Sequence, residues 1–216
     1  SIISGKRKNC VYDGLESTVK FININSQPFE IIFRLSNDGV AFRYFLPEKS
    51  DEIKKIKEET TAFKFNAGTK IFLSPCPDVY MGWCNSQPSY EDYYFQGVEV
   101  GKPSPYASGW VFPALFQKDN TWILLTETSM DGTYCASRLQ QFSENGNYKI
   151  AFPKEGERTS PLAPLLPESV TPWLTPWRII AISDGLKPLM ESTLETDLSI
   201  PAKEAGMLTN NQPSVP

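Results

Sequence analysis

The chain has 216 residues, of which 40% are hydrophobic, with a formal net charge of −4 and no histidine. This length and hydrophobic content suffice for one large domain with its own core. The lack of histidine excludes Ser-His-Asp and Cys-His catalysis and every zinc site that uses histidine. A negative net charge without a long basic run predicts no nucleic-acid partner.

No window of the sequence has the length and hydrophobicity of a membrane-spanning helix, so we expect no membrane partner. The first residues lack the charged-then-apolar layout of a signal peptide. The four cysteines, Cys10, Cys76, Cys84 and Cys135, show no CxxC spacing, which argues against a thiolate metal site. Two disulfides and buried free thiols both remain open, and any bound cation would need oxygen ligands.

The first strands are expected at residues 19–24, 30–35 and 40–46, where β-branched and aromatic residues alternate with polar ones. The last two flank Ser36-Asn37-Asp38-Gly39, and an Asp-Gly step is a strong hairpin signal. The run at 48–59 mixes both charge signs, which is typical of a solvated loop or edge. Within it, residues 51–59 would form one or two helical turns at most.

Further strands are predicted at residues 62–65, 70–73, 93–100, 111–116, 122–125, 148–152, 178–182 and 190–198. Five prolines between residues 161 and 176 predict a long irregular loop over 159–177. Helical periodicity is scarce. The sequence therefore predicts an all-β protein with antiparallel sheets.

An oxygen-rich segment follows the apolar run at 122–125. It contains Thr126, Glu127, Thr128, Ser129, Asp131 and Gly132. Carboxylates and hydroxyls at a strand end are the groups that bind a hard cation or a sugar hydroxyl. Asp131 is the poorer candidate of the two acids, because Met130 to Thr133 is a turn sequence in its own right.

Aromatic residues form a second candidate region. Trp83 and Glu91 are weak candidates for binding a sugar, since they lie among tyrosines at residues 80–94. The alternative, which we favour, is that these rings fill a core or an interface. Trp173, Trp177 and Arg178 have the same two interpretations, and a structural ion pair is the commoner role for such an arginine.

Several short motifs occur in a recognisable order. They are Ile31-Ile32-Phe33-Arg34, Asn37-Asp38-Gly39-Val40-Ala41-Phe42-Arg43-Tyr44, Glu59-Thr60-Thr61-Ala62-Phe63, Ser89-Tyr90-Glu91, Leu125-Thr126-Glu127, Pro176-Trp177-Arg178 and Glu191-Ser192-Thr193-Leu194. In this order the sequence closely resembles the amino-terminal domain of glycoside hydrolase family 97, over roughly residues 5 to 202.

The resemblance implies a β-super-sandwich similar to the galactose mutarotase-like fold, followed in the family by a catalytic (β/α)8 barrel. On this basis residues 1–202 are expected to be the amino-terminal domain, with its first strands preceding Ser1, and residues 203–216 a linker or disordered tail. The family hydrolyses α-glucosides or α-galactosides with calcium. The implied partners are the barrel and an α-linked oligosaccharide, and the implied location is the periplasm or the cell exterior.

The resemblance assigns the catalytic acid and base to the barrel, so no catalytic residue is expected here and the chain alone is expected to be inactive. It assigns one calcium ligand to Glu127. Without the resemblance, Glu127 would simply end an exposed strand. The alternative function is an independent β-sandwich module that binds carbohydrate by itself.

Overall fold

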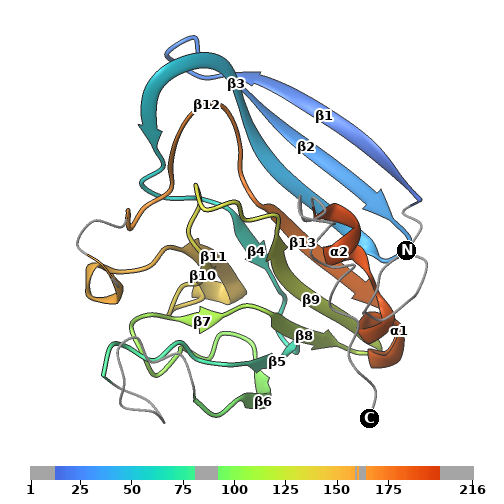
Figure 1. Ribbon diagram of the computed structural model, residues 1–216. Coiled ribbons are helices and arrows are strands. Elements are labelled where there is room, and N and C mark those ends of the chain that lie inside the picture. Colours follow the sequence, from blue (N-terminus) through green and yellow to red (C-terminus); the bar gives the residue numbers. More distant parts are fainter. Residues whose placement is uncertain (1–12, 81–91, 159, 161–163, 200–216) are drawn as a thin grey trace, which may run out of the picture.

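The computed structural model describes residues 13–80, 92–158, 160 and 164–199, drawn as coloured ribbon in Figure 1. Trp83, Glu91 and the expected tail at 203–216 lie outside these ranges. Every strand pair in the described part is antiparallel, which confirms the all-β prediction.

Nine strands form the larger of two sheets. They are β1 (Gly14–Ile22), β2 (Pro28–Ser36), β3 (Gly39–Lys55), β5 (Lys70–Leu73), β6 (Phe95–Glu99), β8 (Ala114–Lys118), β9 (Thr121–Thr128), β12 (Glu168–Leu174) and β13 (Trp177–Ser183). The spatial order is β1-β2-β3-β13-β9-β8-β5-β6, and β12 pairs with the far half of β3.

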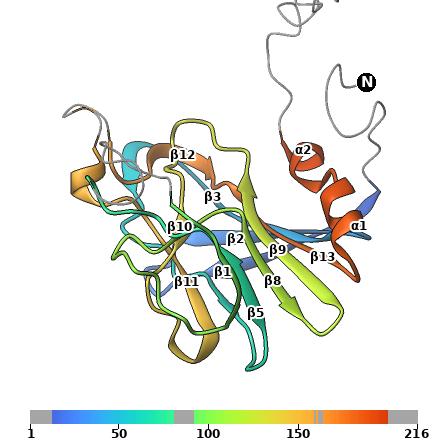
Figure 2. The same ribbon diagram turned by 90° about the horizontal axis from the view of Figure 1, so that it is seen from below.

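The smaller sheet has four strands in the order β4-β11-β10-β7. They are β4 (Ala62–Lys64), β7 (Trp110–Val111), β10 (Arg138–Leu139) and β11 (Asn147–Ala151), and 3₁₀ turns lie at Glu144–Gly146 and Glu155–Glu157. Two short helices, α1 (Leu186–Glu191) and α2 (Leu194–Leu198), follow β13. Figure 2 shows the helices on one side of the larger sheet and the smaller sheet on the other.

The hairpin predicted around Asp38-Gly39 is present between β2 and β3. Ser36 pairs with Gly39, so Asn37 and Asp38 form a two-residue connection. Gly39 has a φ of +149°, and a Cβ there would lie 2.2 Å from the carbonyl oxygen of Ile180. Glycine is required because the backbone of β13 approaches so closely.

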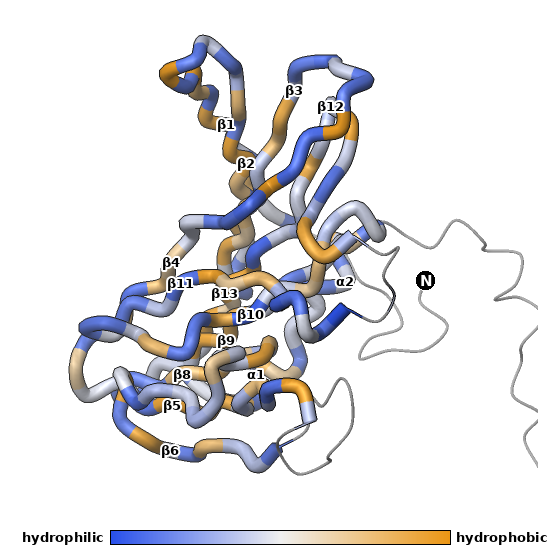
Figure 3. Tube along the Cα trace, turned by 90° about the vertical axis from the view of Figure 1, so that its left-hand side faces the viewer, coloured by the Kyte–Doolittle hydropathy of each residue, from blue (hydrophilic) through white to orange (hydrophobic). Residues whose placement is uncertain are grey.

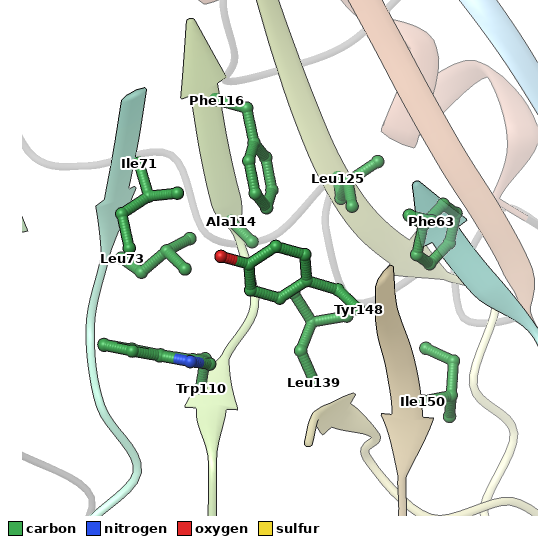
Figure 4. Close-up of a cluster of buried hydrophobic side chains, with 10 residues drawn as sticks. All are labelled: Phe63, Ile71, Leu73, Trp110, Ala114, Phe116, Leu125, Leu139, Tyr148 and Ile150. Atoms are coloured by element: carbon green, nitrogen blue, oxygen red, sulfur yellow. The ribbon is translucent and has the colours of Figure 1, made fainter. Parts of the chain in front are cut away.

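The main core lies between the two sheets (Figure 4). Phe63 and Tyr148 of the smaller sheet face Ile71, Phe116 and Leu125 of the larger one, and all five are at most 7% exposed. The rings of Phe116 and Tyr148 meet edge to face at 5.2 Å, a favoured aromatic geometry. This core holds the two sheets together.

A second core lies on the opposite face of the larger sheet. Leu189, Leu194 and Leu198 of the two helices pack there against Trp177 and Ile179 of β13. The strand predicted at residues 190–198 is therefore wrong. The leucines at 194 and 198 are one helical turn apart, and burial against β13 favours the helix.

Two other local predictions are corrected. Residues 51–55 continue β3 and form no helix, because β12 supplies a partner strand there. The segment at 159–177 is not wholly irregular, since it contains β12. Pro172 is tolerated in this strand because it lies where the pairing with β3 shifts register, between Thr171 and Trp173.

The two cysteines in the described ranges, Cys76 and Cys135, are free thiols. Among the same residues, no helix is long and apolar enough to cross a membrane.

Candidate functional site

Glu127 lies near the end of β9, on the face of the larger sheet that points to the main core. Leu125, two residues earlier on the same face, is 1% exposed. The Glu127 side chain is 6% exposed. This burial excludes the alternative in which Glu127 only ends an exposed strand.

Both carboxylate oxygens of Glu127 accept hydrogen bonds. The backbone amide of Ser137 donates to Oε1 at 2.9 Å, and the hydroxyl of Ser137 donates to Oε2 at 2.5 Å. Arg178 Nη1 also donates to Oε2. Oε1 accepts only one of these bonds, so it retains a lone pair for a further partner.

Arg178 lies directly opposite Glu127 in the pairing of β13 with β9. Its side chain is 1% exposed and its second partner is Glu59, whose side chain is 5% exposed. Arg178 Nε donates to Glu59 Oε1 at 2.9 Å, and Nη2 donates to Oε2 at 2.5 Å. Arg178 thus makes a structural ion pair, as the sequence favoured, with two carboxylates at once.

Tyr134 completes the group. Its hydroxyl donates to Glu59 Oε2 at 2.8 Å, and the Arg178 guanidinium lies 5.6 Å from the centre of its ring. We call Glu59, Glu127, Tyr134, Ser137 and Arg178 the Arg178 cluster. The cluster thus brings two carboxyl groups and one guanidinium together in a buried place.

The pKa directions agree with an ionised Glu59–Arg178 pair. Burial by itself would raise the pKa of Glu59, but the hydrogen bonds and charge of Arg178 outweigh it and lower the pKa below 4.5. For Arg178, burial opposes the charge, and Glu59 more than compensates, so the pKa is raised. Burial, followed by the charge of Glu59, raises the pKa of Tyr134, which therefore stays a hydrogen-bond donor.

The other members of the oxygen-rich segment do not converge on Glu127. Thr128 shares a 2.6 Å hydrogen bond with the Ser199 hydroxyl. Ser129 donates to the carbonyl of Leu198. Asp131 accepts both hydrogen bonds from Thr133, as its turn sequence suggests. In the described ranges, no three acidic, cysteine or histidine residues form a group able to hold a metal ion.

A cavity of about 390 Å³ lies beside Glu127. A second buried ion pair forms part of its wall, with Arg138 Nη1 donating to Glu157 Oε2 at 2.6 Å. Cys76 also lines the cavity, and Arg138 lies 3.3 Å from its sulfur. Arg138 and Glu157 balance one another, and Glu127, which is paired with Arg178, is the other acidic side chain in the wall of this cavity.

The sequence did not single out Ser137 or Tyr134. Glu59 belonged to a charge run predicted to be solvated, and for Glu59 that prediction is wrong. The favoured packing role is confirmed for two tryptophans: Trp173 is 3% exposed and Trp177 is 1% exposed. Trp173 also donates its Nε1–H to Thr133.

Three comparisons relate this chain to known proteins. Residues 1–201 match the family model described as Glycosyl-hydrolase 97 N-terminal. A probable retaining alpha-galactosidase of Streptomyces bingchenggensis is 26% identical over 195 residues, which are 90% of this chain and 26% of that protein.

Solved structures are similar as well. A beta-arabinopyranosidase is 38% identical with a TM-score of 0.80, over 88% of this chain and 30% of that one. A glycoside hydrolase family 97 enzyme from Pseudoalteromonas sp. strain K8, in complex with acarbose, is 21% identical with a TM-score of 0.70. The match covers 92% of this chain and 28% of that one. This chain thus spans under a third of each relative's length, and it belongs to the amino-terminal domain family of glycoside hydrolase family 97.

Proposed function

We propose that this chain is the non-catalytic amino-terminal domain of a calcium-dependent α-glycoside hydrolase, and that it packs on the catalytic (β/α)8 barrel. The match to the family model over residues 1–201 carries the proposal. The chain also covers only 26–30% of the relatives described above, so most of such an enzyme lies outside it. A glycosidase needs two carboxylates flanking the scissile bond, and the buried carboxylates Glu59 and Glu127 are both bound to Arg178.

The role proposed for Glu127 is that of one calcium ligand donated to the active site. Its Oε1 retains a lone pair, and the Arg178 cluster has one more carboxylate than guanidinium. Calcium takes six to eight oxygen ligands, so this single carboxylate fits as a contribution to a site completed by the barrel. Bound there, calcium would supply Lewis-acid polarisation of a sugar oxygen. Ser137 and Arg178 would fix the orientation of the carboxylate.

The substrate proposed is an α-linked oligosaccharide, and the relatives favour a galactose-like sugar. One relative is described as an alpha-galactosidase and another as a beta-arabinopyranosidase. An arabinopyranose of the L series has the ring configuration of galactose without the exocyclic hydroxymethyl group. A periplasmic or secreted location belongs to the same proposal and depends on the family resemblance alone.

The first test uses the 216-residue chain. Nitrophenyl α-galactoside, α-glucoside and β-L-arabinopyranoside should give no turnover, and calorimetry should detect calcium weakly or not at all. Robust turnover would refute the proposal. Tight binding of galactose or maltose without calcium would instead favour an independent carbohydrate-binding module.

The second test uses a longer gene product that includes the barrel. Glu127→Gln should weaken calcium binding and lower activity, because an amide is a poorer calcium ligand than a carboxylate. The matched control is Asp131→Asn, which removes a carboxylate from the turn that follows β9. Equal calcium affinity in the Glu127 variant and the parent would refute the donated-ligand role.

A further inference from the structure

Ser137 holds Glu127 through two groups at once. Its backbone amide donates to Oε1 at 2.9 Å, and its hydroxyl donates to Oε2 at 2.5 Å. Ser137 is 6% exposed, so water does not replace either bond easily. Because one of the two donors is a backbone amide, the position of the Glu127 carboxylate depends on where the backbone lies at Ser137.

The sheet alone fixes that backbone weakly. Ser137 directly precedes β10, which has only two residues. Arg138, the first of them, pairs with Ala151 of β11 and with Val111 of β7. Figure 3 shows β10 next to β11, with β9 close by. Strands usually have about five to six residues, so this short ladder leaves the backbone at its end in need of further support.

The side chain of Arg138 supplies this support from three separate segments. Its Nη1 and Nη2 donate to the two carboxylate oxygens of Glu157, in the 3₁₀ turn at Glu155–Glu157. Nη2 also lies 3.4 Å from the carbonyl oxygen of Phe152, just after β11, and Nη1 lies 3.3 Å from the sulfur of Cys76, after β5. A planar guanidinium bound at several points allows the residue that carries it little movement.

Glu157 is itself held in place. Its side chain is 4% exposed, and its Oε1 also accepts the backbone amide of Lys154 at 2.8 Å. Burial opposes both charges, but the bonds between the two side chains outweigh it, so the pKa of Glu157 is lowered and that of Arg138 is raised. The Arg138–Glu157 pair is therefore ionised and neutral as a unit.

The pair and Glu127 lie at the wall of the same cavity, without touching each other. Ser137 also lines this cavity of about 390 Å³. Within the described part of the chain, the hydrogen bonds of the Arg138 guanidinium go to Glu157, Phe152 and Cys76. Any effect of Arg138 on the geometry of Glu127 is thus transmitted through Ser137.

We propose that Arg138 and Glu157 are positioning residues for Glu127: their ion pair fixes the backbone at Ser137, and Ser137 sets the orientation in which the carboxylate binds calcium. The inference rests on the proposed function, since calcium binding by Glu127 belongs to it. Replacing a group that orients a metal ligand commonly weakens metal binding about 10–100-fold. Because Arg138 acts one residue further away, we expect an effect at the lower end, about tenfold.

The first test separates positioning from simple charge, in the longer gene product that includes the barrel. Arg138→Met removes a positive charge near Glu127, which by itself would strengthen calcium binding. Loss of positioning predicts the opposite, a calcium Kd raised about tenfold in calorimetry. Lys70→Met is the control, since it makes the same charge change at an exposed position of β5 and should bind calcium like the parent. Unchanged or tighter calcium binding in Arg138→Met would overturn the proposal.

A double variant guards against a loss of folding. Arg138→Met alone leaves Glu157 buried without its cation, whereas Arg138→Met combined with Glu157→Met removes both charges together. Replacing a whole buried ion pair with apolar side chains is often neutral for stability, and here it keeps the net charge. The double variant should unfold at a temperature near that of the parent and still bind calcium about tenfold more weakly. Calcium binding equal to that of the parent in the folded double variant would show that the pair is merely structural.

The second test needs no calcium and uses the 216-residue chain. Hydrogen exchange at the Ser137 amide reports the bond to Glu127, and exchange at the Ile182 amide, which donates to the Asp38 carbonyl at 2.9 Å, reports opening of the larger sheet. Arg138→Met should accelerate exchange at Ser137 more than at Ile182. Equal acceleration at both amides, or none at Ser137, would overturn the positioning role.

The two tests distinguish this inference from the proposed function. If Glu127→Gln leaves calcium affinity unchanged, the donated-ligand role is refuted, and exchange at Ser137 still decides whether Arg138 positions the carboxylate. If Glu127→Gln weakens calcium binding but Arg138→Met and the double variant bind calcium like the parent, the positioning role alone is refuted.

Discussion

Glu59 and Arg178 lie 119 residues apart in sequence and form a two-point ion pair in which both side chains are at most 5% exposed. Glu59 precedes the smaller sheet and Arg178 belongs to the larger sheet, so the pair joins the two layers. The planar guanidinium suits this role because it presents parallel donors to Glu59 and a further donor to Glu127.

Replacing Arg178 with methionine should destabilise the fold severely. It would leave the carboxylates of Glu59 and Glu127 buried without their cation, and breaking a buried pair in this way costs about 3–5 kcal/mol. Urea unfolding followed by fluorescence would measure the change. The control is Lys70→Met, which removes an exposed pair with Glu99. It should lower the free energy of unfolding by at most about 1 kcal/mol.

The pKa of Glu59 predicts how stability depends on pH. Since the folded-state pKa is lowered below 4.5, the ionised form stabilises the fold above the unfolded pKa, and this stability is lost as pH falls through the folded pKa. Glu59→Gln should therefore be less stable than the parent near neutral pH and should lose less stability on acidification. The measurement is the free energy of unfolding from about pH 7 to pH 3. Parallel pH profiles for the variant and the parent would contradict the assigned role.

The sequence predicted the strands better than it predicted the Arg178 cluster, for a physical reason. Alternation of apolar and polar residues is local, so the hairpin at Asp38-Gly39 and the strand ending at Glu127 could be located from their own residues. A buried ion pair depends on a partner brought together by the fold. Glu59 looked like the end of a solvated charge run because Arg178 is not visible from its neighbours in the chain.

The same distinction explains the errors in secondary structure. Residues 51–55 have little intrinsic preference for a strand, and pairing with β12 decides their conformation. Leu194 and Leu198 would be apolar positions in a strand or in a helix, and packing on Trp177 selects the helix. Ser137 gave no local signal at all, since its role is to orient a carboxylate ten residues away in the chain.

Gly109 should be the glycine least tolerant of substitution in the loop before β7. Its φ is +89°, and a Cβ would lie 2.0 Å from the carbonyl oxygen of Leu139 in β10. Gly109→Ala should lower the free energy of unfolding by more than about 2 kcal/mol. The backbone of β10 would have to move, and the alanine would also adopt a strained conformation. Gly132→Ala is the matched control, with a φ of +85° and nothing within 4 Å of its Cβ, and should cost about 1 kcal/mol. Thermal unfolding of the two variants would compare them.

Cys135 gives a chemical probe of the Arg178 cluster. Burial, followed by the charge of Glu127, raises the pKa of its thiol to about 12, so the native protein contains almost no Cys135 thiolate near neutral pH. Only the thiolate reacts with iodoacetamide, and an unfolded cysteine has a pKa of about 8.5. Alkylation of Cys135, followed by peptide mass spectrometry, should therefore be slow in the native chain and fast in urea.

Arg178→Met should raise the Cys135 rate under native conditions, because openings of the cluster become more frequent, while Lys70→Met should not. The buried Cys76, whose thiol pKa is also raised, lies beside Arg138 and reports on the neighbouring region in the same experiment. Faster alkylation of Cys135 alone would locate the damage at the Arg178 cluster. Equal acceleration at both cysteines would show that the whole fold opens together, which is the result expected if the Glu59–Arg178 pair holds the two sheets in place.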